Sequence, residues 1–213
     1  MSEPELLPIV ECGDPVLRQR AEPVDPADLG APELQRLVVL MRATMNAAPG
    51  VGLAAPQVGV ALQLAVLQDG PERWGPLSEE DRAARERNSL AFTVLVNPTL
   101  QPVHDDDLVS FYEGCLSVPR ITGVVTRHRA VRVQALDQHG QPIDEIFSGW
   151  TARIVQHEVD HLHGCLYLDR AETRSLSTID NYTQRWVGRS PSAAAEALGF
   201  TLPPATGAAG RIP

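Results

Sequence analysis

The chain has 213 residues with 18 basic and 27 acidic side chains, which gives a formal net charge of −9. This length favours one domain with a core of its own, and 43% hydrophobic residues exclude global disorder. The acidic balance argues against binding to DNA or to an anionic membrane, because both depend on an excess of basic residues. No apolar run approaches the roughly 20 residues that span a bilayer, and the N-terminus lacks the pattern of an export signal. We expect a cytoplasmic protein, a monomer, whose three cysteines form no disulfides.

The first half of the chain contains one predicted helix, two predicted strands and a charged insert. Apolar residues recur at helical spacing from 34 to 45, and a Pro-Gly pair at 49–50 would end that helix. Residues 61–67 are typical of a strand. Residues 70–88 are polar and charged, so we expect an inserted loop with a short solvated helix. A second strand over 91–96 would end at the Asn-Pro pair that follows it.

The second half contains a predicted hairpin, a predicted helix and a tail. Apolar and polar residues alternate in 131–135 and again in 143–147, with a glycine-containing turn between them, which predicts a β-hairpin. Residues 150–162 have the apolar positions of a helix. From 190 to 213 Pro, Ala and Gly dominate, so we expect a weakly ordered tail after a single catalytic domain over 1–189.

The strongest chemical signal is the sequence HEVDH at 157–161. Residues four apart lie on one face of a helix, so the two imidazoles can hold one metal ion with Glu158 beside its open position. A catalytic site of this kind needs a third protein ligand. Glu172, which is 11 residues beyond His161, and Cys115 are both candidates. Alternatively, Cys115 could pair with a histidine as the nucleophile of a thiol hydrolase.

Three segments together resemble the bacterial peptide deformylases: GVGLAAPQVG at 50–59, EGCLSVP at 113–119 and QHEVDHLHG at 156–164. Each segment is specific, and their order and spacing also agree with that family over roughly residues 5–185. The resemblance implies an α+β fold in which antiparallel β-sheets pack around a central helix that carries the HExxH metal motif.

The resemblance assigns three metal ligands, one general acid/base and two oxyanion donors. The ligands would be Cys115, His157 and His161. Glu158 would take a proton from the metal-bound water and pass it to the leaving amine. The side-chain amide of Gln57 and the backbone N–H of Leu116 would bind the oxygen that becomes negatively charged.

The resemblance also assigns residues that bind the substrate or support the site. Backbone groups near the first motif would pair with an extended peptide, and a side-chain pocket would hold its methionine. The substrate-binding residues would be Val51, Gly52, Gly114, Phe111, Trp150, Arg153 and Ile154. Trp150 and Arg153 stand where some deformylases have Leu and Ile, so the indole and the Arg stem would form apolar walls. Glu113 would pair with Arg127 and hold the loop of Cys115 in shape.

The implied enzyme is a metal-dependent hydrolase that removes the formyl group from N-formyl-methionyl nascent peptides and releases formate. The metal would lower the pKa of its bound water, which is the nucleophile. Fe(II) is expected in the cell, with Zn, Ni or Co as substitutes, and any contact with the ribosome would be transient. Two other functions stay open: a relative that binds or cleaves another acyl group, and a generic zinc endopeptidase with Glu172 as its third ligand.

Overall fold

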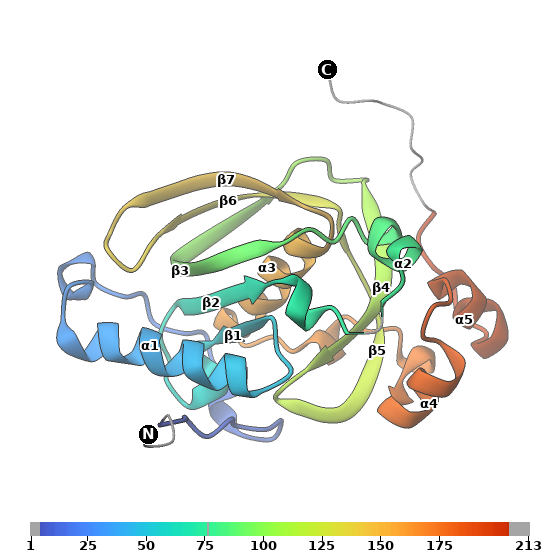
Figure 1. Cartoon of the computed structure of the whole chain (residues 1–213), viewed down its shortest axis with the longest axis horizontal. Helices are drawn as coiled ribbons and strands as arrows, with labels where there is room; N and C mark the ends of the chain where they lie inside the picture. The colour runs from blue at the N-terminus through green and yellow to red at the C-terminus, as the bar shows by residue number, and fades with distance from the viewer. Residues whose placement is uncertain (1–4, 76, 205–213) are drawn as a thin grey trace.

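The computed structural model describes residues 5–75 and 77–204 (Figure 1). The helices are α1 (Pro32–Ala47), α2 (Glu79–Ala84), α3 (Gly149–Leu162), α4 (Ile179–Arg185) and α5 (Pro191–Leu198). The strands are β1 (Gly52–Ala54), β2 (Leu64–Asp69), β3 (Leu90–Pro102), β4 (Leu108–Cys115), β5 (Val118–His128), β6 (Ala130–Leu136), β7 (Pro142–Ser148) and β8 (Ser177–Thr178). No helix in these two ranges is both long and apolar enough to cross a membrane.

A five-stranded antiparallel sheet in the order β1-β2-β3-β6-β7 forms the larger layer. Side chains alternate between its two faces, and at β2 both faces are covered. In β2, Leu64 and Val66 pack with Met41 and Met45 of α1, whereas Leu67 packs with residues of α3. This double burial explains why β2 is apolar at most positions instead of alternating with polar residues.

The helix α3 lies between the larger sheet and a three-stranded sheet in the order β4-β5-β8 (Figure 1). Val155 and Val159 on one side of α3 pack against Val131 and Val133 of β6. The helix also contacts β5 of the smaller sheet. The antiparallel α+β fold with a central helix is therefore confirmed.

Most of the elements predicted from the sequence are confirmed. The helices α1 and α3 are present, α2 is the short helix of the insert, and β6 and β7 form the hairpin, with Gly140 at φ 80° in its turn. The predicted end of a strand at Asn97-Pro98 is wrong, because β3 continues to Pro102 across a shift in register. At this bulge Asn97 has φ 51°, and its amide group bonds both backbone groups of Val24, at 2.8 and 2.9 Å.

The expectation of a weakly ordered tail is wrong for the first part of the tail. Residues Pro191–Leu198 form α5, and Ser190 caps its start by accepting a hydrogen bond from the backbone N–H of Ala193. Ala194 is fully buried in a cluster with Trp186 and with residues of the smaller sheet. The small alanine side chains that suggested low order allow the helix to approach the sheet closely. Residues 205–213 lie outside the described residues.

Candidate active site

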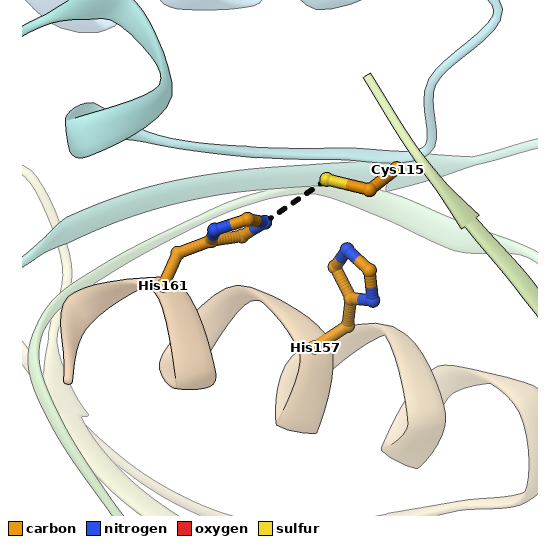
Figure 2. A group of neighbouring side chains, drawn as sticks. All are labelled: Cys115, His157 and His161. Atoms are coloured by element: carbon orange, nitrogen blue, oxygen red, sulfur yellow. Dashed lines mark hydrogen bonds between the residues drawn. The ribbon is translucent and has the colours of Figure 1, made fainter. Parts of the chain in front are cut away.

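The three proposed metal ligands lie together at the centre of the molecule (Figure 2). The helix α3 places His157 and His161 on one face, one turn apart, and the end of β4 brings Cys115 above them. The ligand atoms of these three residues all lie within 4.8 Å of one another. In the described part of the chain Cys115, and not Glu172, completes this group.

The ligand atoms have the spacing and the chemistry of a transition-metal site. Cys115 Sγ lies 3.3 Å from His161 Nε2. With metal–ligand bonds of about 2.0–2.3 Å, neighbouring ligand atoms of a tetrahedral site lie about 3.5 Å apart. One thiolate and two imidazoles suit zinc, iron, nickel or cobalt, whereas magnesium and calcium prefer oxygen ligands. The residues present therefore fit a divalent transition-metal ion.

A buried charge network orients His157. Its Nδ1 atom lies 2.9 Å from Glu113 Oε2, so the imidazole donates to the carboxylate and its other nitrogen is free for a metal. The predicted pairing of Glu113 with Arg127 is confirmed, with Nε···Oε1 and Nη2···Oε2 distances of 2.7 and 2.9 Å. Burial raises the pKa of Glu113, but the charge of Arg127 and the hydrogen bond with His157 hold it well below its usual range. The carboxylate therefore stays ionised.

Sequence reasoning missed the outer part of this network. Arg127 Nη1 also donates to Asp160 Oδ2 at 2.8 Å, and Arg170 donates to both oxygens of Asp160 at 2.8 Å. Asp160 lies inside the HEVDH motif, three residues after His157, and this position on the same side of the helix was a usable signal. The position of Arg170 depends on the chain folding back after α3, which no local pattern indicates.

Glu158 follows His157 on α3, and its carboxyl group lies against β1. A Cβ atom at position 52 would lie 2.3 Å from Glu158 Oε1, so any residue other than Gly52 would push the carboxyl group away. Glu158 is 4% exposed, and its Oε2 atom is buried with no hydrogen-bond partner among the described residues. Burial raises the pKa of Glu158 to about 7. A carboxyl group in this range can accept and return a proton near neutral pH.

Gln57 lies in a short 3₁₀ helix, Ala55–Val58, directly after β1. Its Oε1 atom accepts a hydrogen bond of 2.8 Å from the backbone N–H of Ala54, which fixes the orientation of the amide. Its Nε2 atom donates to Cys115 Sγ at 3.4 Å, an ordinary distance for sulfur, and lies 3.4 Å from Ser117 Oγ, a long distance for oxygen, so one of its N–H groups is only weakly used. A buried amide that is held by its oxygen has this donor group ready for another acceptor.

A cavity of about 550 Å³ opens from this centre. It is lined by Gln57, Cys115, Leu116, His157 and Glu158, and by six of the expected substrate-binding residues, Val51, Gly52, Gly114, Trp150, Arg153 and Ile154. Phe111, the seventh expected residue, lies behind the wall of the cavity. Phe111 packs edge-on against Trp150, with ring centroids 6.0 Å apart, and does not line the cavity.

Arg153 lines the cavity as expected, and its guanidinium group has a second role that the sequence did not indicate. That group is buried and donates to Glu113 Oε1 at 2.5 Å and to the backbone oxygens of Val125 and Val109 at 2.9 and 2.6 Å. Arg153 therefore neutralises Glu113 through Oε1, the oxygen that His157 does not contact. A planar guanidinium group can serve three acceptors at once, and this function is not visible from spacing alone.

Sequence reasoning also missed the residues at the outer end of the cavity, which include Arg120, Ile121 and Ile179. Arg120 and Ile121 follow the second motif along β5, and Ile179 is the first residue of α4. Ile179 is 44% exposed, so its apolar side chain is open to contact with a ligand. These residues would contact the part of a ligand that extends away from the metal centre.

Known proteins with similar sequences support the interpretation of this site as a metal-dependent active site. The sequence profile of the family described as polypeptide deformylase matches residues 6–176. The chain is 56% identical over 197 residues to peptide deformylase 3 of Streptomyces avermitilis, which covers 92% of this chain and 85% of the relative. It is 41% identical over 177 residues to the mitochondrial peptide deformylase of Homo sapiens, which covers 83% of this chain and 72% of the relative.

Solved structures agree with the sequence relatives. The crystal structure of a class I type b peptide deformylase from Acinetobacter baumannii with bound Met-Ala-Ser matches with a TM-score of 0.69 at 34% identity, covering 78% of this chain and 98% of that one. The peptide deformylase from Thermotoga maritima matches with a TM-score of 0.66 at 32% identity, covering 79% and 99%. The fold, the Cys-His-His cluster and these relatives lead to one conclusion: the chain belongs to the polypeptide deformylase family.

Proposed function

We propose that the protein removes the formyl group from the N-terminal formyl-methionine of new polypeptides and releases formate. The observation that carries this proposal is the buried carboxyl group of Glu158 beside the cluster of Cys115, His157 and His161, at the inner end of the cavity. Amide hydrolysis needs a proton acceptor beside the attacking water. A cavity of about 550 Å³ has room for a methionine side chain and the peptide that follows it.

Cys115, His157 and His161 would hold one divalent metal ion, which when bound supplies a Lewis acid that brings the pKa of water towards neutrality. We propose Fe(II) as the ion used in the cell, with Zn, Ni or Co as substitutes, because thiolate and imidazole ligands suit all four. Glu113, held by Arg127 and Arg153, keeps the ring of His157 in the orientation needed for binding.

The residues of this chain would then move one proton and stabilise one charge. Glu158 accepts the proton of the attacking water and gives it to the amine that leaves when the C–N bond breaks. Negative charge builds on the formyl oxygen during the attack. The Nε2–H of Gln57 and the backbone N–H of Leu116 donate to that oxygen, because both residues line the cavity beside Cys115.

The substrate would bind as an extended strand. The strand β1 lies at the edge of the larger sheet and pairs with β2 on one side, so the backbone of Val51 and Gly52 can pair with a peptide on the other. The methionine side chain would enter the pocket formed by Trp150, Ile154 and the stem of Arg153. The relative from Acinetobacter baumannii holds Met-Ala-Ser, which is the peptide that deformylation of formyl-Met-Ala-Ser leaves.

The remaining parts of the proposal concern where and with what the protein works. We propose that residues 1–189 form the catalytic domain and that it acts as a monomer in the cytoplasm, where nascent chains are made. Its net charge of −9 gives little attraction to RNA, so contact with the ribosome would be transient.

The decisive experiment is anaerobic hydrolysis of formyl-Met-Ala-Ser by the Fe(II)- or Ni(II)-loaded full chain, with formate release as the readout. Glu158→Ala is measured beside it, with metal content determined for both proteins. Release that disappears in a variant that still holds its metal supports the proposal and the role of Glu158. No release from a fully loaded wild-type protein would overturn it, and peptides with other acyl groups would be tested next.

A further inference from the structure

The insert over residues 70–88 has no role in the proposed function, yet it touches both sides of the cavity. It connects β2 to β3 and contains α2 and a short 3₁₀ helix, Pro71–Arg73. Figure 1 shows α2 beside β4, and residues of α2 and β4 line one shared depression of the surface. We call the described residues of this insert, 70–75 and 77–88, the strap.

The first part of the strap holds the loop that leads into β1. Arg73 Nη1 donates to the backbone oxygen of Gly50 at 2.6 Å, and its Nη2 donates to Asn46 Oδ1 at 2.5 Å. Gly50 lines the cavity and directly precedes the residues proposed to pair with the peptide backbone. The strap therefore holds one rim of the cavity through a hydrogen bond from the charged guanidinium group of Arg73 to a carbonyl oxygen.

The last part of the strap holds the opposite wall. The guanidinium groups of Arg85 and Arg87 lie 4.9 and 5.4 Å from the ring centre of Trp150, which lines the cavity. Arg87 is fixed in turn by two hydrogen bonds to the buried Asp69, at 2.7 and 2.9 Å. Arg85 also lies 5.2 Å from the ring centre of Phe111 and so occupies the corner between the two rings.

The strap also approaches the backbone at the start of α3. A Cβ atom at position 149 would lie 2.5 Å from Glu86 Cβ and 2.6 Å from the Glu86 backbone oxygen, and Gly149 has φ 57°. The residue next to Trp150 must therefore be glycine for the strap to pack where it does. Arg153 also lies 5.9 Å from the centre of the Trp150 ring, so close backbone packing and three cations, two of them from the strap, restrict the indole.

We propose that the strap, acting through Arg85, positions the indole of Trp150 and thereby sets the width of the pocket for the methionine side chain. This inference rests on the proposed function. Arg85 is a positioning residue, because it contacts Trp150 and Phe111 and does not line the cavity. Its removal should weaken recognition of the methionine side chain and leave the hydrolysis step intact.

The test compares Arg85→Gln with Arg82→Gln in the metal-loaded full chain. Arg82 is a matched control, because it lies in the same insert with its guanidinium group over a different ring, that of Trp74, at 5.1 Å. Dissociation constants for Met-Ala-Ser and Ala-Ala-Ser are measured by calorimetry, and KM and kcat are measured with the two formylated peptides. Arg85→Gln should weaken binding of the methionine peptide about two- to five-fold, the loss expected for one partly exposed cation–π contact. Binding of the alanine peptide and kcat should stay unchanged, and Arg82→Gln should change neither.

Each other outcome is decisive as well. Unchanged binding of Met-Ala-Ser, or equal weakening for both peptides, would overturn the role of Arg85. If Arg85→Gln does not fold, Arg85→Met keeps the apolar stem and must show the same selective loss. A wild-type protein that binds Met-Ala-Ser but releases no formate would contradict the proposed function alone, and the strap would still be judged from the dissociation constants. A wild-type protein that binds neither peptide would overturn both.

Discussion

The two ends of the cavity differ in whether their charged side chains are paired within the protein. At the inner end Glu113 is buried and has His157, Arg127 and Arg153 as partners, all within 2.9 Å. At the outer end Arg120 is exposed, and its side chain forms no hydrogen bond or ion pair with any described residue. Both ends line one continuous cavity, so the contrast does not arise from separate sites.

The difference separates a buried charge that is neutralised by other protein groups from an exposed charge that is open to a ligand. A buried charge must be neutralised within the protein, since an unpaired ion in a low dielectric costs several kcal/mol. The network at the inner end is therefore complete before any substrate arrives, which is the condition for holding His157 in one orientation. An exposed cation is solvated by water, so leaving it unpaired lowers the stability of the protein very little. Arg120 can therefore remain unpaired until a ligand with an acidic group binds.

Breaking the inner network should have the largest effect. Arg127→Met leaves Glu113 and Asp160 without their shared partner, and removal of one member of a buried ion pair typically costs about 3–5 kcal/mol. We expect the free energy of unfolding, measured by denaturant titration, to fall by about that amount, together with weaker metal retention.

The matched control for this prediction is Arg132→Gln. Arg132 forms a similar two-bond pair with Asp144, at 2.6 Å for each bond, but on the open surface of the hairpin. Its replacement should leave the free energy of unfolding almost unchanged, because exposed ion pairs contribute little to stability. Equal destabilisation by the two variants would contradict the distinction between buried and exposed networks.

Removing the oxyanion donor at the inner end should affect the rate and not the fold. Gln57→Ala takes away one of the two proposed donors to the formyl oxygen, and loss of such a donor typically lowers kcat by about 10²–10³. Formate release under saturating substrate measures the effect, with metal content as a check. Gln63→Ala serves as the control, because Gln63 also bonds a backbone group, the oxygen of Ala21 at 3.1 Å, outside the cavity. A Gln57→Ala variant with wild-type kcat would exclude this amide from the reaction.

The outer end should show the smallest effect, and one that depends on salt. Arg120 lines the same cavity at its outer end, so we expect it to lie beside the residues that follow methionine in an extended peptide. We expect a KM for formyl-Met-Glu-Ser about two- to five-fold lower than for formyl-Met-Gln-Ser at low ionic strength. The difference should vanish in Arg120→Gln and shrink in concentrated salt. A preference that survives in the variant would locate the acidic selectivity elsewhere.

Local patterns predicted those parts of the molecule that depend on local geometry. The spacing of His157 and His161 requires only a helix, and the alternation in 131–135 requires only a strand with one buried face. The third ligand was not determined by spacing, since Cys115 and Glu172 were both open until the resemblance and then the fold separated them. Ligand identity at this position depends on how β4 is packed against α3, which is a long-range property.

One omission and one error have the same origin. The resemblance placed the stem of Arg153 beside the methionine pocket, but nothing in it indicated that the guanidinium group reaches Glu113 on another element. The tail was expected to be weakly ordered from its composition, but the contact of Ala194 with the cluster around Trp186 decides its structure. In both cases a partner distant in sequence determines the structure, and local patterns do not reveal it.

The strand β1 is three residues long and lies at the edge of its sheet. A peptide that pairs with such an edge presents the same N–H and C=O groups whatever side chains it carries. In the proposed binding mode the main-chain contacts would not distinguish one peptide sequence from another, and selectivity would come from the side-chain pocket and from Arg120. Such a site would accept the N-termini of many different polypeptides, and the short edge of β1 would contact only their first few residues.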